Sequence, residues 1–199
     1  MNTVLALWKR GLKAFFRNKA GLIFSILIPF FFIYVFGAIF KNDFIENPVA
    51  YMLSGVIIVN VFESALTISS STVDDMVSGF MKEVLVSPVK RVSVAAGQIL
   101  TAATVSTLQG LLILVIGMFI GIKFTTWLTP VYVVLSMISV GLVFSGVGLF
   151  LSTIIKSGQT FQIVKTAIVL PLTFISGAYI PLSILPSGLK YVAYFNPMT

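Results

Sequence analysis

The sequence predicts an all-α membrane protein, a polytopic helical bundle. Of its 199 residues 58% are hydrophobic and only 10% are charged, and the mean hydropathy is +1.07. A chain of this composition has too few polar groups to cover a soluble globule, so lipid must be its main solvent. Its apolar runs are long and unbroken, which favours helices over the alternating pattern of a β-barrel.

Five runs are long enough to cross a bilayer. The first, residues 20–40, has 21 residues, and a helix rising about 1.5 Å per residue would cross a hydrocarbon core of roughly 30 Å. It is longer than the apolar part of a signal peptide and no small-residue cleavage site follows, so we expect it to remain in the mature protein. The other predicted spans are residues 49–72, 93–121, 130–153 and 164–180.

Residues 1–19 predict an amphipathic helix that lies in the lipid headgroup plane. At about 100° per residue its apolar and basic side chains fall on opposite sectors. This helix is either a simple topogenic anchor or an elbow that transmits movement from the cytoplasm to the first span. The apolar sector contains Val4, Leu5, Trp8, Leu12, Phe15 and Phe16, and the basic sector contains Lys9, Arg10, Lys13 and Arg17.

The basic residues predict a cytoplasmic N-terminus. With loops placed alternately on the two sides, only Lys41, Lys123 and Lys190 fall outside, and the inverted topology would reverse the excess. The formal charge of +7 is therefore explained by anionic lipid, and nucleic acid is not an expected partner. The inner set is Lys9, Arg10, Lys13, Arg17, Lys19, Lys82, Lys90, Arg91, Lys156 and Lys165.

Residues 73–91, between the second and third spans, are too polar to cross a membrane and predict a short cytoplasmic helix. Asp74 and Asp75 would suit its N-terminus, and Pro88 would end it. Its apolar face would hold Phe80 and Val84 and, less directly, Met81 and Leu85. Such a face needs a partner, either the membrane surface or another protein.

The sequence predicts no catalytic, cofactor-binding or metal-binding residue. It has no cysteine and no histidine, which excludes thiol nucleophiles, imidazole bases and Cys/His metal sites. It also has no GxxxxGK[ST] phosphate-binding loop, so any ATP hydrolysis must belong to another polypeptide. A membrane-embedded enzyme is therefore a weak alternative.

One acidic residue, Glu63, lies near the middle of a predicted span, where an ionised side chain costs at least a few kcal/mol. It could line a translocation pathway, bind a cationic substrate, or stay protonated and hydrogen-bond another helix. Lys165, near the inner end of the fifth span, can extend to the interface. An ATPase-independent secondary transporter or channel is a second hypothesis, but such proteins usually carry several ionisable residues at the midplane.

Small residues at a spacing of four, Gly117 with Gly121 and Gly141 with Ser145, permit close helix packing. We expect internal packing here rather than a dimer interface. Pro171, Pro181 and Pro186, three of the four prolines from the fifth span onward, predict a broken or re-entrant outer segment over residues 181–199.

Two motifs resemble one family, the type 2 ATP-binding cassette (ABC) exporter permeases. The stretch from Gly79 to Arg91, GFMKEVLVSPVKR, is similar to their cytoplasmic loop. Ser176-Gly-Ala-Tyr-Ile-Pro-Leu182, then Leu185-Pro186, and finally Asn196-Pro-Met-Thr199 are similar to the segment after their fifth span. Because members have six spans, we expect a sixth helix that this sequence lacks, although five spans would be permissible.

The resemblance implies a transport subunit of a bacterial or archaeal cell membrane that exports a hydrophobic or amphiphilic substrate, such as a drug, an antibiotic or a lipid. Two permeases, identical or different, would pair, and each would receive a cytoplasmic ABC ATPase that binds the ATP. The helix between the second and third spans would be the coupling helix. The implied docking residues are Gly79, Phe80, Met81, Glu83, Val84, Leu85 and Pro88.

Overall fold

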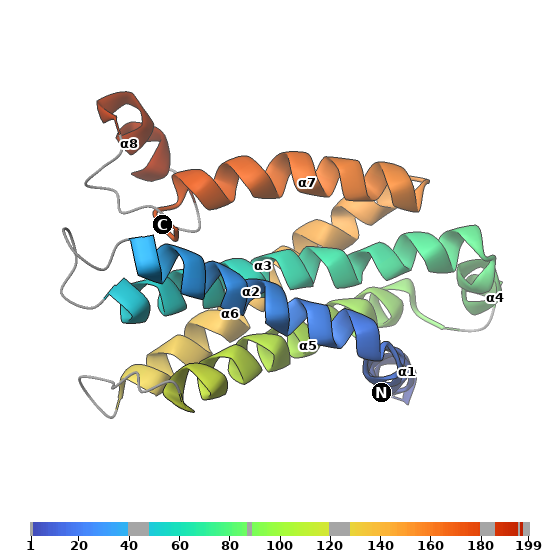
Figure 1. Cartoon of the computed structure of the whole chain (residues 1–199). Helices are drawn as coiled ribbons and strands as arrows, with labels where there is room; N and C mark the ends of the chain where they lie inside the picture. Colours follow the sequence, from blue (N-terminus) through green and yellow to red (C-terminus); the bar gives the residue numbers. More distant parts are fainter. Residues whose placement is uncertain are drawn as a thin grey trace.

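The computed structural model describes residues 2–39, 48–86, 89–119, 128–179, 186–194 and 196. This described part is built from helices (Figure 1). They are α1 (Asn2–Arg17), α2 (Lys19–Ile39), α3 (Pro48–Val77), α4 (Phe80–Val86), α5 (Arg91–Phe119), α6 (Thr129–Ile154), α7 (Gly158–Ile175) and α8 (Ser187–Tyr194).

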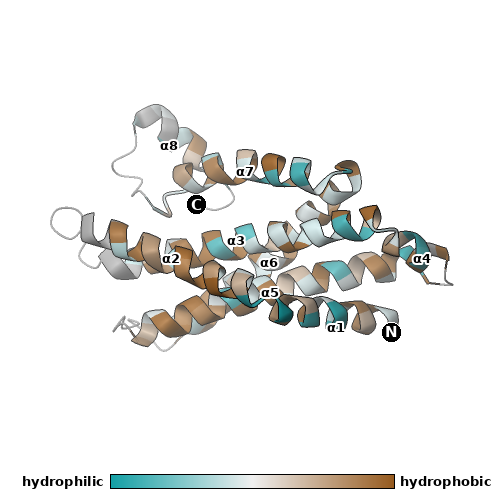
Figure 2. Cartoon of the chain, turned by 45° about the vertical axis from the view of Figure 1, so that its right-hand side comes forward, coloured by the Kyte–Doolittle hydropathy of each residue, from teal (hydrophilic) through white to brown (hydrophobic). Residues whose placement is uncertain are grey.

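The prediction of a polytopic helical bundle is confirmed. Within the described ranges, α3, α5, α6 and α7 are each long and apolar enough to cross a membrane. A fifth span is present if α1 and α2, which are bent by 74° about Asn18, count as one broken helix. We treat α1 and α2 separately because their compositions differ. Helix α2 is almost entirely hydrophobic, whereas α1 carries hydrophilic residues, as α4 does (Figure 2).

Helix α3 lies at the centre of the bundle and contacts α2, α5, α6 and α7. One face of its middle is enclosed, and the Phe62 side chain is 1% exposed. The Phe62 ring packs edge-on against Phe144 of α6, with 4.4 Å between ring centroids, an arrangement that aromatic quadrupoles favour. The bundle is therefore organised around the second predicted span.

Small residues allow the close approach of the helices around α3. A Cβ atom placed on Gly117 of α5 would lie 2.6 Å from Leu53 of α3, and one on Gly141 of α6 would lie 3.0 Å from Ser106 of α5. Ser145 is fully buried, and its carbonyl accepts a hydrogen bond from Ser69 of α3. Gly117, Gly141 and Ser145 thus contribute to internal packing, as predicted, whereas Gly121 lies outside the described residues.

Helix α1 packs on α5 rather than lying free of the bundle. A Cβ atom on Gly11 would lie 2.2 Å from Thr101, and one on Gly97 would lie 3.0 Å from Leu7, so both helices approach through glycines. Trp8 Nε1 donates a 3.1 Å hydrogen bond to Thr104 Oγ1. Within the predicted apolar sector, the side chains of Leu5 and Phe16 are about half exposed and can contact lipid.

The polar stretch after the second span folds differently from the prediction. Asp74 and Asp75 belong to the last turns of α3, which continues to Val77, and the separate helix α4 begins only at Phe80. Gly79 makes the turn between them with a φ of +81°, a conformation that glycine adopts without steric cost. The prediction that the two aspartates begin the cytoplasmic helix is wrong.

Asp74 instead lies against the N-terminus of another helix, α7. A Cβ atom on Gly158, the first residue of α7, would be 3.1 Å from Asp74 Oδ1. A carboxylate suits this place because the first backbone N–H groups of a helix have no partner within it. Asp74 thus does lie at the N-terminus of a helix, where the dipole favours a carboxylate, but that helix is α7. The two come together only in the folded protein.

At the other end of the bundle, the chain that follows α7 packs against the start of α3. A Cβ atom on Gly55 would lie 2.4 Å from the Ala178 carbonyl oxygen, and Tyr51 Oη donates a hydrogen bond to the Gly177 carbonyl. Asn196 Nδ2 donates a 2.7 Å hydrogen bond to the Leu172 carbonyl of α7. The predicted re-entrant path itself depends on residues 180–185, which lie outside the described part.

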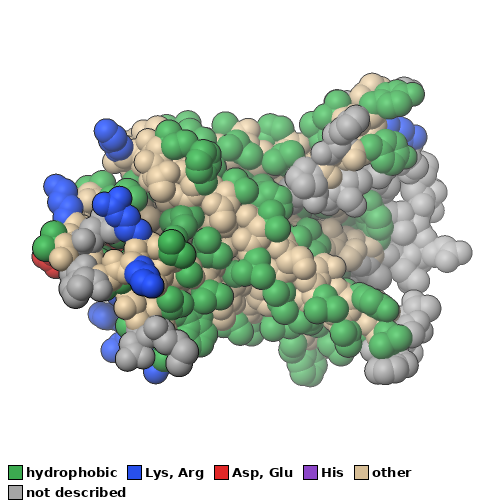
Figure 3. Space-filling model, turned by 180° about the vertical axis from the view of Figure 1, so that it is seen from behind, with side chains coloured by type: hydrophobic (Ala, Val, Ile, Leu, Met, Phe, Trp, Pro, Cys, Tyr) green, Lys and Arg blue, Asp and Glu red, His purple; other side chains and the backbone are tan. Residues whose placement is uncertain are grey.

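Exposed basic side chains gather at the end of the bundle that holds α1 and α4, which we call the basic end (Figure 3). The flanks beside it are covered largely by hydrophobic side chains. This separation of a charged end from an apolar flank is the surface of a protein embedded in lipid. The exposed basic residues of α1, α4 and the helix ends beside them are Lys9, Arg10, Lys13, Arg17, Lys19, Lys82, Lys90, Arg91 and Lys156.

Candidate functional site

One cavity among the described residues is a slot of about 510 Å³. Its walls are α2 and α3, residues of α5 lie at its base, and α1 adjoins it at the basic end. The slot has apolar walls, with residues such as Ile28, Phe32 and Val59, but polar side chains also enter it. It passes from Arg10 and Asp75 at one end toward Tyr179 at the other.

Glu63 lies on this slot, where it faces a cation from a different helix. Lys165 Nζ of α7 is 3.6 Å from Glu63 Oε1 and donates a 3.0 Å hydrogen bond to Thr67 Oγ1. The Lys165 side chain is only 11% exposed, whereas that of Glu63 is 50% exposed. Pairing lowers the cost of holding each charge within a span. Lys165 therefore points into the bundle, contrary to the expected extension to the interface.

Two buried amides also line the slot. Asn60 of α3 is 8% exposed and Gln109 of α5 is 4% exposed. Asn60 Nδ2 donates a 3.2 Å hydrogen bond to the Ser25 carbonyl of α2, but Asn60 Oδ1 and Gln109 Oε1 accept no hydrogen bond from the described residues. Both oxygens are themselves enclosed, with less than 1 Å² of accessible surface each, so each is an unsatisfied acceptor within the helix packing, which costs stability.

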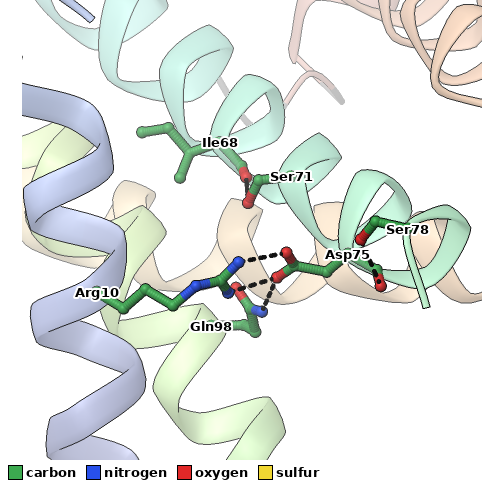
Figure 4. A network of polar contacts seen from close by, with 6 residues as sticks. All are labelled: Arg10, Ile68, Ser71, Asp75, Ser78 and Gln98. Carbon is green, nitrogen blue, oxygen red and sulfur yellow. Dashed lines mark hydrogen bonds and ion pairs between the residues drawn. The ribbon is translucent and has the colours of Figure 1, made fainter. Parts of the chain in front are cut away.

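At the basic end of the slot, a polar network joins three helices (Figure 4). Arg10 of α1 donates two hydrogen bonds, of 2.9 and 2.7 Å, to the carboxylate of Asp75 at the end of α3. Gln98 of α5 adds a weaker contact of 3.4 Å to the same carboxylate. The hydrogen bonds that Arg10 donates to Asp75 raise the pKa of its guanidinium, so the arginine stays charged. Such two-pronged pairing fixes orientation as well as position.

The same arginine reaches the predicted docking helix. The Arg10 guanidinium carbon lies 3.9 Å from the centre of the Phe80 ring, within the range of a cation–π contact. Arg10 therefore connects α1, the end of α3 and the start of α4. Phe80 uses one ring face inside this protein, so it is less available as a docking anchor than the sequence suggested.

The other predicted docking residues divide between packing and exposure. Met81 is buried at 7% exposure, Val84 is partly buried, and Glu83 is exposed on α4. Val86, which the prediction did not include, is 88% exposed. Pro88 and the side chain of Leu85 lie outside the described residues. The surface that the described side chains of α4 offer to a partner is thus more polar than predicted, with Lys82, Glu83 and Val86 as its accessible groups.

Sequence reasoning missed Lys165, Asn60 and Gln109 as site residues. The signal was present for all three, because each is a polar side chain inside a long apolar run. An acidic residue within one span usually pairs with a basic residue of another, and Lys165 is the basic residue of the fifth predicted span. Buried amides carry no charge, and only the packing of α3 against α5 places both of them among the residues around one cavity.

The fold and site define an integral membrane protein whose spanning helices enclose a polar-lined slot, the architecture of a transport protein. The chain belongs to the ABC-2 type transporter family, because residues 2–199 match the sequence model of that family. It is 26% identical over 193 residues to the transport permease ycf38 of Cyanophora paradoxa, covering 92% of this chain and 66% of that protein. It is a permease of this family, as the sequence motifs predicted.

Two further relatives match this chain at a comparable sequence identity. Nodulation protein J of Rhizobium leguminosarum bv. viciae is 24% identical over 98% of this chain and 77% of its own length. The inner membrane transport permease YadH of Escherichia coli K12 is 25% identical over 74% of this chain and 57% of its own length. The chain thus spans 66% of ycf38, 77% of nodulation protein J and 57% of YadH.

Proposed function

We propose that this chain is the transmembrane subunit of an ABC exporter and moves a hydrophobic or amphiphilic substrate outward with energy from a separate ATPase subunit. The observation that carries the proposal is the link from α4 through Arg10 to Asp75, at the basic end of the slot. A force applied to α4 would reach α1 through this side chain, and would reach α3 both through it and through the turn at Gly79. Family membership supports the same assignment.

The topology follows from the charge distribution. The basic end faces the cytoplasm, because exposed Lys and Arg residues collect there and anionic lipids and the positive-inside rule favour that side. The N-terminus is then cytoplasmic in a cell membrane, α1 lies along the inner headgroup region, and α4 projects toward the cytoplasmic ATPase. Two permeases pair, each with its own ATPase.

In this proposal, the residues that line the slot form one wall of the translocation pathway. It combines apolar walls with the Glu63–Lys165 pair and two amides, a lining that suits a molecule with an apolar body and a polar head. Glu63 is half exposed and can therefore contact such a molecule directly. The ion pair also joins α3 to α7, so a movement of either helix would change the width of the slot.

Charge reversal at Glu83 tests the coupling. We expect Glu83→Lys to reduce permease-stimulated ATP hydrolysis at least tenfold, about 1.4 kcal/mol of lost interaction, because Glu83 is the exposed charged group of α4 that the resemblance assigns to docking. The measurement is ATPase activity of the reconstituted complex in lipid vesicles, with permease assembly checked by size-exclusion chromatography.

Lys156→Glu is the matched control, since it reverses another exposed charge at the basic end, in the connection between α6 and α7. It should retain most of the stimulated activity. Equal loss in both variants would show that activity is sensitive to any charge change at the basic end, and would contradict docking on α4. Transport that continues at full rate without any ATPase would instead support a secondary transporter or channel.

A further inference from the structure

Glu63 differs from the other charged side chains around the slot in how its charge is satisfied. Arg10 and Asp75 share two hydrogen bonds, of 2.9 and 2.7 Å. Lys165 donates a 3.0 Å hydrogen bond to Thr67. The Glu63 carboxylate has Lys165 Nζ at 3.6 Å, beyond hydrogen-bond distance, and accepts no hydrogen bond from the described residues. It therefore keeps its acceptor capacity for a further partner.

This carboxylate is also accessible, whereas its partner is enclosed. The Glu63 side chain lines the slot and is 50% exposed, but the Lys165 side chain is 11% exposed. A molecule in the slot can therefore reach the anion of this pair more readily than the cation. Arg10, the exposed cation at the basic end of the slot, already directs two N–H groups at Asp75. The charge that the slot offers to a ligand is negative.

Polar side chains of α3 lead from the basic end of the slot to Glu63. Thr67 and Ser71 follow Glu63 at a spacing that places all three on one face of the helix, and all three are exposed and line the slot. The Ser71 hydroxyl donates a 2.7 Å hydrogen bond to the Ile68 carbonyl (Figure 4). The Thr67 hydroxyl donates one of 2.8 Å to the Glu63 carbonyl. Both hydroxyls have used their protons, so this face offers acceptors to a ligand.

The rest of the lining suits the body of an organic cation. Phe32 and Tyr179 line the slot with their ring centroids 5.2 Å apart, and the faces of aromatic rings attract cations. Ile28 and Val56 add hydrocarbon, which suits an alkyl chain. The formal charge of the whole chain is +7, so its overall field repels cations. A cation that binds here must be held by a local group.

We infer that Glu63 is the binding subsite for the cationic head group of an amphiphile, an ammonium whose N–H groups donate to the carboxylate. This inference rests on the proposed function and narrows its substrate class from amphiphiles in general to organic cations. The ligand need not displace Lys165, because Thr67 holds the lysine through its own hydrogen bond. One carboxylate has enough acceptor sites for both cations.

The experiment compares two probes with the same alkyl chain, octylammonium and 1-octanol, which both donate hydrogen bonds and differ in charge. The permease is held in lipid discs of phosphatidylcholine, a lipid without net charge, at about pH 7.5, where an alkylammonium is protonated. Binding of each radiolabelled probe is measured by equilibrium dialysis, and binding to protein-free discs is subtracted. The thermal midpoint of unfolding shows whether each variant is folded.

We expect the wild-type protein to bind octylammonium at least about fivefold more tightly than 1-octanol, because a close charge pair in a partly desolvated slot supplies a difference of that order. Glu63→Gln should abolish this preference, since the amide keeps the shape without the charge. Lys165→Met is the matched control. It breaks the same ion pair but leaves the carboxylate, so it should keep the preference. The double variant has neither charge and should lack the preference, which tests the inference even if Glu63→Gln alone does not fold.

Equal binding of the two probes to the wild-type protein, or a preference that survives Glu63→Gln, would overturn the inference. Equal loss of the preference in Lys165→Met would also overturn it, because the ion pair would then serve the structure of the slot and not the ligand. The experiment contains no ATPase, so its outcome is independent of the Glu83 test. A cation preference can persist where coupling to an ATPase fails, and coupling can persist where the cation preference is absent.

Discussion

Replacement of Gly55 by alanine is expected to destabilise the permease by about 2 kcal/mol. A Cβ atom at this position would lie 2.4 Å from the carbonyl oxygen of Ala178 and 2.7 Å from its Cα. Both atoms are backbone, so no side-chain rotation can relieve the overlap, and overpacking of this kind costs about 3 kcal/mol at its upper range. The intrinsic helix preference for alanine returns about 1 kcal/mol. Thermal unfolding in lipid discs measures the difference.

Gly146→Ala is the control for this prediction. Gly146 lies inside α6, where a Cβ atom would meet nothing within 4 Å. This variant should therefore keep or slightly raise the thermal midpoint, since only the helix preference acts. If Gly55→Ala is as stable as Gly146→Ala, the segment after α7 does not pack on α3 as described.

Removal of the Arg10 side-chain charge is expected to be the second strongest change. Arg10→Met leaves the carboxylate of Asp75, whose side chain is only 11% exposed, with the 3.4 Å contact to Gln98 as its remaining side-chain hydrogen bond among the described residues. Breaking a buried pair from one side costs roughly 3–5 kcal/mol. Arg10 is 48% exposed, so water screens the pair and we expect about 2 kcal/mol.

The measurement is again the thermal midpoint, with Lys13→Met as the charge-matched control on the same helix. Lys13 is exposed, and its loss should shift the midpoint little. The double variant Arg10→Met with Asp75→Leu should be more stable than Arg10→Met alone, because it removes the stranded carboxylate. A double variant as unstable as the sum of its single changes would mean that the two residues act independently.

The spans could be predicted from sequence because their signal is local. Each of the four helices that satisfy the length and hydropathy criteria begins and ends within a few residues of an uncharged run, except where α3 continues to Val77 and α7 begins early at Gly158. Charge marks where a chain must leave hydrocarbon but not where a helix must end. Polar residues such as Asp74 and Asp75 can continue a helix into water when tertiary partners hold them.

The site was only partly predictable for a related reason. Glu63 is conspicuous as a charge within an apolar run, and its residue type alone marks it. Its partner Lys165 is 102 positions away (165 − 63), and the pair of Arg10 with Asp75 joins elements separated by 65 positions. No helical periodicity relates residues at these separations. Arg10 was assigned to a solvated basic sector because only the bend at Asn18 and the packing of α1 on α5 bring it to α3.

The central claim is that α4 is the surface on which a cytoplasmic ATPase docks. Because the chain has no cysteine, a single cysteine can be introduced at Val86, which is 88% exposed on α4, or at Tyr191, which is 73% exposed on α8. Each variant is labelled with a photo-reactive maleimide in membranes containing the ATPase and then illuminated. The account predicts a covalent ATPase adduct from Val86→Cys and none from Tyr191→Cys. An adduct from Tyr191→Cys alone would contradict it.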